Sequence, residues 1–314
     1  MCESTAATAP DLDTLVARAG LLVESLPYIR RYWGKIVVIK YGGAAMIDDA
    51  LKQAVITDIV LMRYVGMKPV LVHGGGPEIT ALMDRLGKKP LFVDGLRVTD
   101  RDTADIAGMV LAGKVNKDIV SRLNAAGGKA VGISGPDGGL IQARRKVHVV
   151  SSGPKEGEQA DLGFVGEVTA IDPAVLYTLM EAGYVPVVAP IGVGAQGETL
   201  NINADSAAGE LAAALGAQKL ILLTDVPGIL RDPKDPSTLM STVRQGQVPA
   251  LVHDGFVRGG MVPKVDACVR ALQAGVPRAH IVDGRIPHAL LLEIFTDQGV
   301  GTMVLPDQCC GGEG

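Results

Sequence analysis

Short apolar runs alternate with longer amphipathic stretches from residue 35 to the end of the chain. Six runs of β-branched and aliphatic residues have the length of buried strands: 36–39, 70–72, 130–133, 185–190, 220–224 and 280–282. Between them, apolar residues recur at helical spacing in 51–66, 77–86, 103–126, 173–181, 206–215, 263–274 and 287–295. This alternation predicts an α/β protein, an open αβα sandwich with a mainly parallel central sheet.

Two segments depart from the alternation. Residues 11–33 have the pattern of an amphipathic helix, which Pro27 should kink. The apolar stripe of this helix either packs back on the domain, the commoner arrangement, or docks on another subunit. The composition of residues 142–168 predicts an excursion rich in hairpins. We expect disorder in 1–10, the helix in 11–33, and two lobes over 34–217 and 218–314.

Composition narrows the class of protein. Of the 314 residues, 47% are hydrophobic and 20% are charged, which is typical of a soluble globular protein with a sizeable core. The net charge of −4 gives no broad basic surface for nucleic acid, and no apolar run reaches the ~20 residues of a membrane span. The four cysteines lack metal-ligand spacing and a disulfide-framework pattern, which favours a cytosolic compartment.

Glycine-rich turns follow the first two predicted strands. Three glycines at 74–76 precede Pro77, which suits the first turn of a helix, and two glycines follow Lys40 at the end of the first strand. Backbone N–H groups at such turns bind anions, because no side chain blocks close approach and the helix dipole favours negative charge. A tight turn without a ligand and a solvated lysine are the alternatives for either motif alone.

Two further motifs are chance matches. Residues 108–114 match a phosphate-binding loop, but Val115 stands where Ser or Thr must hold magnesium, and the segment lies inside a predicted helix. Residues 192–197 match a dinucleotide fingerprint, yet 198–203 does not have a helical pattern. We interpret 192–197 as a hairpin turn, whereas a nucleotide-dependent dehydrogenase would need a helix there.

Polar residues in three other segments have the chemistry of a binding site. Arg97 has a planar fork that suits bidentate binding of a carboxylate, although an exposed arginine is the commoner case. Asn201, Asn203 and Asp205 alternate before a predicted helix, where simple N-capping is the alternative. Lys264 falls in the first turn of a helix, where the dipole is already positive, so an anion is expected beside it.

In this order, the motifs resemble the amino acid kinase family, and within it the N-acetyl-L-glutamate kinases. The N-terminal helix and the segments Asp-Gly-Arg at 283–285, His288 and Gly-Val-Gly-Thr at 299–302 resemble the arginine-sensitive type. The similar segments span nearly the whole chain: Lys-Tyr-Gly-Gly-Ala-Ala-Met at 40–46, His-Gly-Gly-Gly-Pro at 73–77, Gly-Leu-Arg-Val-Thr at 95–99, Asn-Ile-Asn-Ala-Asp at 201–205 and Gly-Gly-Met-Val-Pro-Lys at 259–264. The resemblance implies transfer of the γ-phosphoryl group of ATP to the side-chain carboxylate of N-acetyl-L-glutamate, in arginine or ornithine biosynthesis. Magnesium would be bound through the ATP phosphates, without a metal site built from protein ligands.

The resemblance also implies roles for single residues. Lys40 and Lys264 would stabilise the transition state, Asp205 would orient them, and Gly43 would donate its N–H. The amino acid would be held by Gly75, Gly76, Arg97, Asn201 and Asn203. The nucleotide would lie along Lys40, Gly42, Gly43, Asp225, Val226, Pro227, Gly228, Ile229, Leu230, Phe256, Val257, Arg258 and Lys264. The attacking carboxylate is ionised at neutral pH, with a pKa of ~4.3, so no general base is required and His73 is assigned a structural role.

Regulation by arginine is implied as well, at a site between the N-terminal helix and the C-terminal lobe. The candidate residues are Tyr28, His288, Gln298, Gly299 and Gly301. Gln298 stands where we expect glutamate, and without that carboxylate the grip on a guanidinium group should weaken. The N-terminal helices would interlace dimers into a hexamer, and a PII-type nitrogen regulator is a partner implied by photosynthetic relatives. The expected location is the cytoplasm, or the plastid stroma in a photosynthetic eukaryote.

The same motifs fit other hypotheses for the function. A kinase for a longer acylated amino diacid such as N-acetyl-aminoadipate, or a carbamate or aspartate kinase, would share the two lysines. A catalytically silent arginine-sensing or scaffolding subunit is the alternative from another class. The presence of Lys40, Lys264 and Asp205 together speaks against it.

Overall fold

The computed structural model describes residues 11–94, 96–149, 157–297 and 299–307. In this part of the chain the largest sheet has eight strands, in the spatial order β12 (Thr242–Arg244), β14 (Gly301–Leu305), β13 (Ala279–Asp283), β11 (Lys219–Thr224), β1 (Ile36–Tyr41), β2 (Lys68–His73), β8 (Val185–Ala189) and β5 (Ala130–Ser134). Neighbouring strands are parallel except β13 and β14, so β12 and β14 run against the other six. Those six are the predicted strands, and the predicted fold class is confirmed.

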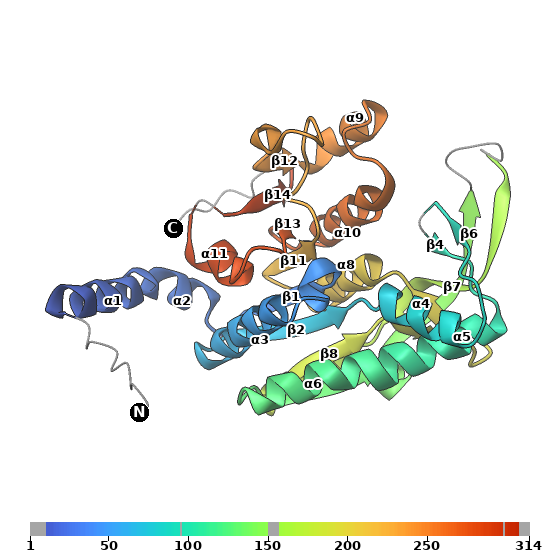
Figure 1. The fold of residues 1–314 in the computed structure, drawn as a ribbon, viewed down its shortest axis with the longest axis horizontal. Coiled ribbons are helices and arrows are strands. Elements are labelled where there is room, and N and C mark those ends of the chain that lie inside the picture. The colour runs from blue at the N-terminus through green and yellow to red at the C-terminus, as the bar shows by residue number, and fades with distance from the viewer. Residues whose placement is uncertain (1–10, 95, 150–156, 298, 308–314) are drawn as a thin grey trace, which may run out of the picture.

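Helices cover both faces of this sheet (Figure 1). One core contains side chains of α7 (Ala174–Glu181), α8 (Ala204–Ala214), α9 (Val248–His253) and α10 (Val262–Gln273). The other contains those of α3 (Asp49–Tyr64), α4 (Gly76–Arg85), α5 (Arg101–Gly108), α6 (Asn116–Ala125) and α11 (Ala289–Phe295). Alternate residues of a strand point to opposite faces and pack in different cores. Val38 packs in the first core, and Val37 and Ile39 pack in the second. Each such buried side chain stabilises the fold by about 1.5–3 kcal/mol.

The helix predicted at 103–126 is interrupted. Between α5 and α6 the chain forms a π-helical segment, Met109–Val115, and this segment contains all of the chance match to a phosphate-binding loop except Gly108. Apolar periodicity did not reveal the interruption, because Val110, Leu111 and Val115 are all buried and continue the apolar stripe. The segment packs beside the glycine turn that precedes α4, where Leu111 would meet any side chain on Gly75.

The excursion rich in hairpins is confirmed. β6 (Ile141–Val149) and β7 (Gln159–Ile171) pair antiparallel, and with β9 (Ile191–Val193) and β10 (Thr199–Ile202) they close into a small barrel. β9 and β10 are the hairpin predicted around 192–197, so the dinucleotide reading is excluded there. The remaining short elements are the hairpin β3 (Phe92–Val93) and β4 (Leu96–Arg97), and 3-10 turns at Gly43–Met46, Asp137–Gly139, Pro236–Thr238, Gln245–Gln247 and Gly259–Met261.

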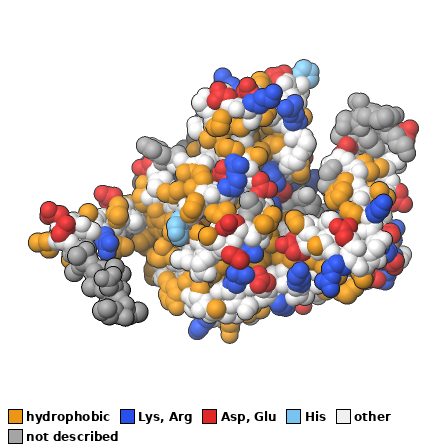
Figure 2. All heavy atoms as spheres, viewed as in Figure 1, with side chains coloured by type: hydrophobic (Ala, Val, Ile, Leu, Met, Phe, Trp, Pro, Cys, Tyr) orange, Lys and Arg blue, Asp and Glu red, His pale blue; other side chains and the backbone are white. Residues whose placement is uncertain are grey.

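The N-terminal helix breaks near Pro27, as predicted, into α1 (Leu12–Glu24) and α2 (Leu26–Tyr32). α2 contacts α11, where the Tyr28 and Phe295 rings meet edge to face at 6.5 Å. α1 extends away from the body at the left of Figure 1, and its side chains form part of the arm at the left of Figure 2. No residue of α1 is buried, so this helix does not pack back on the domain.

The predicted lobe boundary at 217/218 falls between α8 and β11. The sheet runs across it without a break, because β1 pairs with β2 on one side and with β11 on the other. The division into lobes therefore stays a prediction, and the predicted disorder of 1–10 lies outside the described residues. Within those residues, none of the helices combines the length and the apolarity needed to cross a bilayer.

Candidate active site

The carboxyl ends of β1 and β2 bring the two glycine turns together. The turns are joined by a hydrogen bond of 2.8 Å from the Gly74 N–H to the Tyr41 carbonyl. A cavity of about 190 Å³ opens at this point, lined by Lys40, Gly42, Gly43, Met46, Ile47, Gly74, Gly75, Gly76, Pro77, Glu78, Asn203, Ala204 and Asp205. The predicted anion-binding turns therefore share one cavity with the start of α8.

Two of these glycines leave no room for a side chain. A Cβ atom on Gly42 would lie 2.6 Å from Lys40 Nζ, and one on Gly43 would lie 2.2 Å from Asp225 Oδ1. Gly43 also has a φ of 73°, in the left-handed region that favours glycine. The backbone of this turn lines the cavity without side chains, so an anion can approach it closely.

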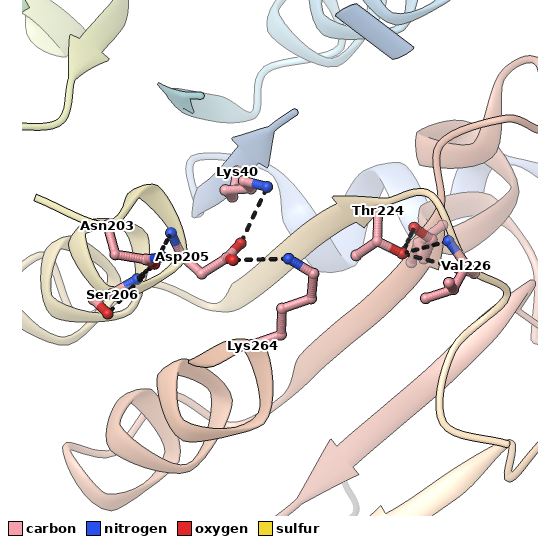
Figure 3. Close-up of polar contacts among 8 residues, drawn as sticks. Lys40, Asn203, Asp205, Ser206, Thr224, Val226 and Lys264 are labelled. Carbon is pink, nitrogen blue, oxygen red and sulfur yellow. Dashed lines mark hydrogen bonds and ion pairs between the residues drawn. The ribbon is translucent and has the colours of Figure 1, made fainter. Parts of the chain in front are cut away.

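Asp205 joins the two predicted lysines (Figure 3). Asn203 caps α8 by accepting hydrogen bonds from the N–H groups of Asp205 and Ser206, at 2.9 and 3.1 Å, and this cap fixes the first turn. Asp205 Oδ2 accepts a hydrogen bond of 2.8 Å from Lys264 Nζ, and Oδ1 forms an ion pair of 3.2 Å with Lys40 Nζ. Asp205 is thus the anion that was expected beside Lys264 at the start of α10.

Burial and charge set the protonation of this cluster. Burial disfavours the Asp205 carboxylate, but Lys40 and Lys264 outweigh burial and hold its pKa below the usual range. Burial is also the main cause that lowers the pKa of Lys40, opposed by the attraction of Asp205 and reinforced by repulsion from Lys264. The Oδ1 atom of Asp205 is buried and accepts no hydrogen bond from the described residues. With both lysines protonated, the cluster carries one net positive charge and can attract an anion.

A second cavity, of about 180 Å³, adjoins the first through residues 74–76 and contains Arg97, Asn201 and Asn203. Arg97 Nη2 donates to the Gly76 carbonyl at 3.0 Å and to Thr80 Oγ1 at 2.8 Å. The Arg97 guanidinium also lies 4.7 Å from the centre of the Phe92 ring. The residues predicted to hold the amino acid are therefore brought together, around a guanidinium whose position is fixed by its neighbours.

The predicted nucleotide segment 225–230 begins where β11 ends. Thr224 Oγ1 donates to the Val226 carbonyl at 2.8 Å and accepts from the Val226 N–H at 3.2 Å, which folds the chain into a turn (Figure 3). Asp225 in this turn lies against Gly43. The side chains of Ile229 and Val257 are each 1% exposed and belong to the core. Only the backbone of those two residues can face a nucleotide, whereas Arg258 is exposed.

This donor set fits the triphosphate of ATP. Ammonium and backbone N–H groups complement phosphate oxygens, and the side-chain-free turns give those oxygens room. Among the described residues, no group of three or more His, Cys, Asp or Glu side chains could hold a metal ion. Magnesium commonly reaches such sites on the phosphates of the nucleotide, with few protein ligands.

The candidate effector residues are only partly brought together. Tyr28, Gly299 and Gly301 line a cavity of about 260 Å³ between α2 and the edge of the sheet. His288 does not line it. The turn before α11 instead places His288 Nδ1 2.5 Å from Asp58 Oδ1 on α3, while Gln298 lies outside the described residues.

The same cavity contains a buried charge cluster that the sequence analysis missed. Lys219 Nζ lies 3.5 Å from Glu293 Oε1, and His280 Nδ1 lies 2.6 Å from the same oxygen. The three residues are at most 7% exposed. Charged residues inside apolar segments are the sequence signal that could have revealed this cluster. Lys219 begins an apolar strand, and Glu293 stands among the leucines of α11.

The fold and the cavity together define the class: the Lys40 ammonium and two glycine turns line one cavity of an αβα sandwich, and the Lys264 ammonium donates to the Asp205 carboxylate in its wall. This arrangement suits phosphoryl transfer by a small-molecule kinase. The sequence model of the amino acid kinase family matches residues 35–283, and the chain belongs to this family.

Curated relatives are similar over almost their full length. The acetylglutamate kinase of Heliobacterium modesticaldum is 60% identical over 288 residues, which are 92% of this chain and 98% of that protein. The acetylglutamate kinase of Pelotomaculum thermopropionicum is 58% identical over 287 residues, 91% of this chain and 97% of that protein.

Solved structures support the same fold. The N-acetylglutamate synthase of Neisseria gonorrhoeae, complexed with coenzyme A and N-acetyl-glutamate, matches with a TM-score of 0.77 at 27% identity. The match covers 93% of this chain, which spans 64% of that synthase chain. A carbamate kinase from Giardia lamblia bound to AMP-PNP matches with a TM-score of 0.61 at 18% identity, over 87% of this chain and 99% of that chain, and shows the fold alone.

Proposed function

We propose that this protein transfers the γ-phosphoryl group of ATP to the side-chain carboxylate of N-acetyl-L-glutamate, giving N-acetyl-L-glutamyl 5-phosphate. The observation that carries the proposal is the convergence of Lys40 and Lys264 on Asp205 beside the glycine turns. The names of the relatives supply the substrate, because acetylglutamate kinases are 60% and 58% identical to this chain. The product serves arginine biosynthesis.

The chemistry requires charge stabilisation more than proton transfer. The attacking carboxylate is already ionised, so the barrier lies in bringing two anions together and in the charge of the moving phosphoryl group. Lys40 and Lys264 offset that charge, Asp205 orients both ammonium groups, and the N–H groups of Gly43 and Gly75 donate to the reacting oxygens. Magnesium would be carried on the ATP phosphates and would neutralise further charge there.

Substrate selection is assigned to the second cavity. Arg97 and Asn201 hold the acetylated amino acid, with Gly76 at the junction of the two cavities. Asn203 uses Oδ1 for the helix cap, so its Nδ2 group is the part that can contact substrate. The nucleotide lies along 225–230 and 256–258, close to Lys264.

Arginine inhibition is proposed at the cavity that contains Tyr28, Gly299 and Gly301. The Asp297 carboxylate in its wall suits a guanidinium or ammonium group. A hexamer assembled through the N-terminal helices fits the exposed apolar side chains of α1, which include Leu12, Leu22 and Val23. Binding of a PII-type regulator, and the cellular compartment, stay predictions.

One coupled assay tests the activity. The chain is incubated with ATP, magnesium and N-acetyl-L-glutamate, and hydroxylamine traps the acyl phosphate as a hydroxamate. Glutamate and N-acetyl-aminoadipate serve as competing substrates. Faster turnover of N-acetyl-aminoadipate would move the function to the longer diacid, and no hydroxamate with any of the three would leave the silent arginine-sensing subunit as the better reading.

A further inference from the structure

His73, the last residue of β2, is fully buried beside the glycine turn and takes no part in the proposed chemistry. Its Nδ1 atom lies 2.7 Å from the Gly74 carbonyl oxygen. Its Nε2 atom lies 3.2 Å from the side-chain nitrogen of Asn116, which also donates to the Val187 carbonyl at 2.9 Å. The network therefore runs from α6 through the imidazole ring to the backbone of the turn.

The hydrogens of this network have only one arrangement. The Gly74 carbonyl can only accept, so His73 Nδ1 carries the proton, and Nε2 must then accept from Asn116. The two amide hydrogens of Asn116 go to His73 and Val187, while its Oδ1 accepts from Lys117 Nζ at 3.1 Å. Burial lowers the pKa of His73 to about 4, so the ring is neutral near pH 7.

The carbonyl that His73 holds controls the next N–H group. In a trans peptide the carbonyl of one residue and the N–H of the next point in opposite directions. With the Gly74 carbonyl turned toward the imidazole, the Gly75 N–H is turned away from it. Gly75 lies ahead of the first intrahelical bond of α4, from Ile79 N–H to the Gly75 carbonyl, so the helix does not use that N–H group.

We propose that His73 and Asn116 are positioning residues for the phosphoryl-transfer reaction, which fix the Gly74–Gly75 peptide so that the Gly75 N–H faces the reacting oxygens. The inference rests on the proposed function. Asn116 is the first residue after the π-helical segment Met109–Val115, and π-helical turns are frequent at functional sites. The segment also packs on the turn, since a Cβ on Gly75 would lie 2.6 Å from Leu111 Cδ2.

The substitution Asn116→Asp tests this through pH. An aspartate can only accept from Nε2, so a neutral His73 moves its proton to Nε2 and presents a lone pair to the Gly74 carbonyl. A doubly protonated ring still donates from Nδ1. The new carboxylate raises the pKa of His73, so the variant keeps its kcat at low pH, where the ring is doubly protonated, and loses it as pH rises. We expect a fall of about 10–100-fold between pH 6 and pH 9 that the wild type lacks, comparable to partial loss of one oxyanion donor.

In the described part of the chain, the charged group that acts on His73 is Lys117 of α6. The titratable neighbour is Tyr41, which pairs with His73 from β1 and has a pKa raised by burial. Asn124→Asp, on the same helix, is the matched control, because Asn124 also donates its side-chain N–H to a backbone carbonyl, that of Ala130 at 3.2 Å. The pH profile of its kcat should match that of the wild type. The proposal is overturned if kcat of Asn116→Asp varies with pH as in the wild type, or if Asn124→Asp shows the same fall in kcat as pH rises.

A second pair of variants tests the proposal even if Asn116→Asp does not fold. His73→Asn keeps an amide donor within reach of the Gly74 carbonyl, whereas His73→Leu fills the space without a donor. We expect kcat of the leucine variant to be at least about tenfold below that of the asparagine variant, with KM for ATP alike, because only the oriented N–H is lost. Equal kcat values overturn the proposal.

Failure of the proposed function is recognised separately. An inactive wild type contradicts that function, whereas an active wild type with insensitive variants contradicts the positioning role alone. Crystal structures of the two His73 variants give a readout without activity. The Gly74 carbonyl should face position 73 in the asparagine variant and turn away in the leucine variant, and an unchanged carbonyl in both overturns the inference.

Discussion

Two buried carboxylates, each with two basic neighbours, lie at opposite ends of the central strands. Asp205 holds Lys40 and Lys264 at the carboxyl end of β1. Glu293 holds its neighbours at the other end of the sheet, where Lys219 begins β11 and His280 is the second residue of β13. Both clusters are positioned by the ends of strands of the central sheet. The Asp205 cluster lies beside glycine turns, whereas the Glu293 cluster lies at the opposite end of the strands.

The hydrogen bonds of the two clusters differ. Lys219 donates to the Glu293 carbonyl at 3.1 Å, and both carboxylate oxygens of Glu293 have donors, with the Val300 N–H 3.4 Å from Oε2. Within the described residues, Asp205 Oδ1 forms an ion pair with Lys40 and accepts no hydrogen bond. Burial lowers the pKa of His280, so its ring adds little charge. The Asp205 cluster therefore keeps a net positive charge beside glycine turns, which suits catalysis, whereas the charge of Glu293 is neutralised by Lys219, which suits a structural role.

Removal of Lys219 should give the largest effect and should act on stability. Lys219→Ala leaves Glu293 buried with a neutral histidine, and breaking a buried pair from one side costs about 3–5 kcal/mol of unfolding free energy. Denaturant unfolding measures this. Arg270→Ala is the control, because the Arg270–Glu210 pair is exposed on one side and should cost under about 1 kcal/mol. Equal losses in the two variants would contradict the structural role of the Glu293 cluster.

Removal of Lys264 should act on catalysis. Lys264→Ala should lower kcat by roughly 10²–10³, by analogy with loss of one oxyanion donor, and Lys40→Ala should do the same. Arg270→Ala is again the matched control, since Arg270 and Lys264 both reach from α10 to an acidic residue of α8. Turnover of Lys264→Ala within a few-fold of the wild type removes Lys264 from the mechanism.

The sequence predicted one cluster and not the other for a physical reason. Lys40, Asp205 and Lys264 stand at strand ends and helix starts, which local patterns locate, and parallel strands bring such ends to one edge. Lys219 and Glu293 are 74 residues apart in the chain and lie inside apolar segments, so only the three-dimensional pairing of β11 with α11 reveals them. The same holds for Asn116, whose contact with His73 depends on a π-helical segment without a sequence signature.

Removal of Arg97 should change substrate binding more than turnover. Arg97→Ala removes the guanidinium that lines the second cavity, and we expect KM for the amino acid to rise by roughly 10–100-fold, the range of one lost charged hydrogen bond. KM for ATP should stay the same, because Arg97 does not line the cavity beside Lys40. Steady-state kinetics with each substrate varied separates the two. An unchanged KM for the amino acid would exclude Arg97 from the site.

The smallest expected effect is on the pH dependence of catalysis at the Asp205 cluster. Burial lowers the pKa of Lys40, and its ammonium form is the active one, so kcat/KM should fall at a lower pH than an ordinary lysine would give. Bound ATP adds negative charge and raises that pKa, so the fall in kcat should come at higher pH than the fall in kcat/KM. Lys40→Arg keeps its charge throughout and should lose this alkaline limb, at reduced activity. If kcat/KM of Lys40→Arg still falls at high pH, another group causes the fall. The net positive charge of the Asp205 cluster would then not limit the reaction.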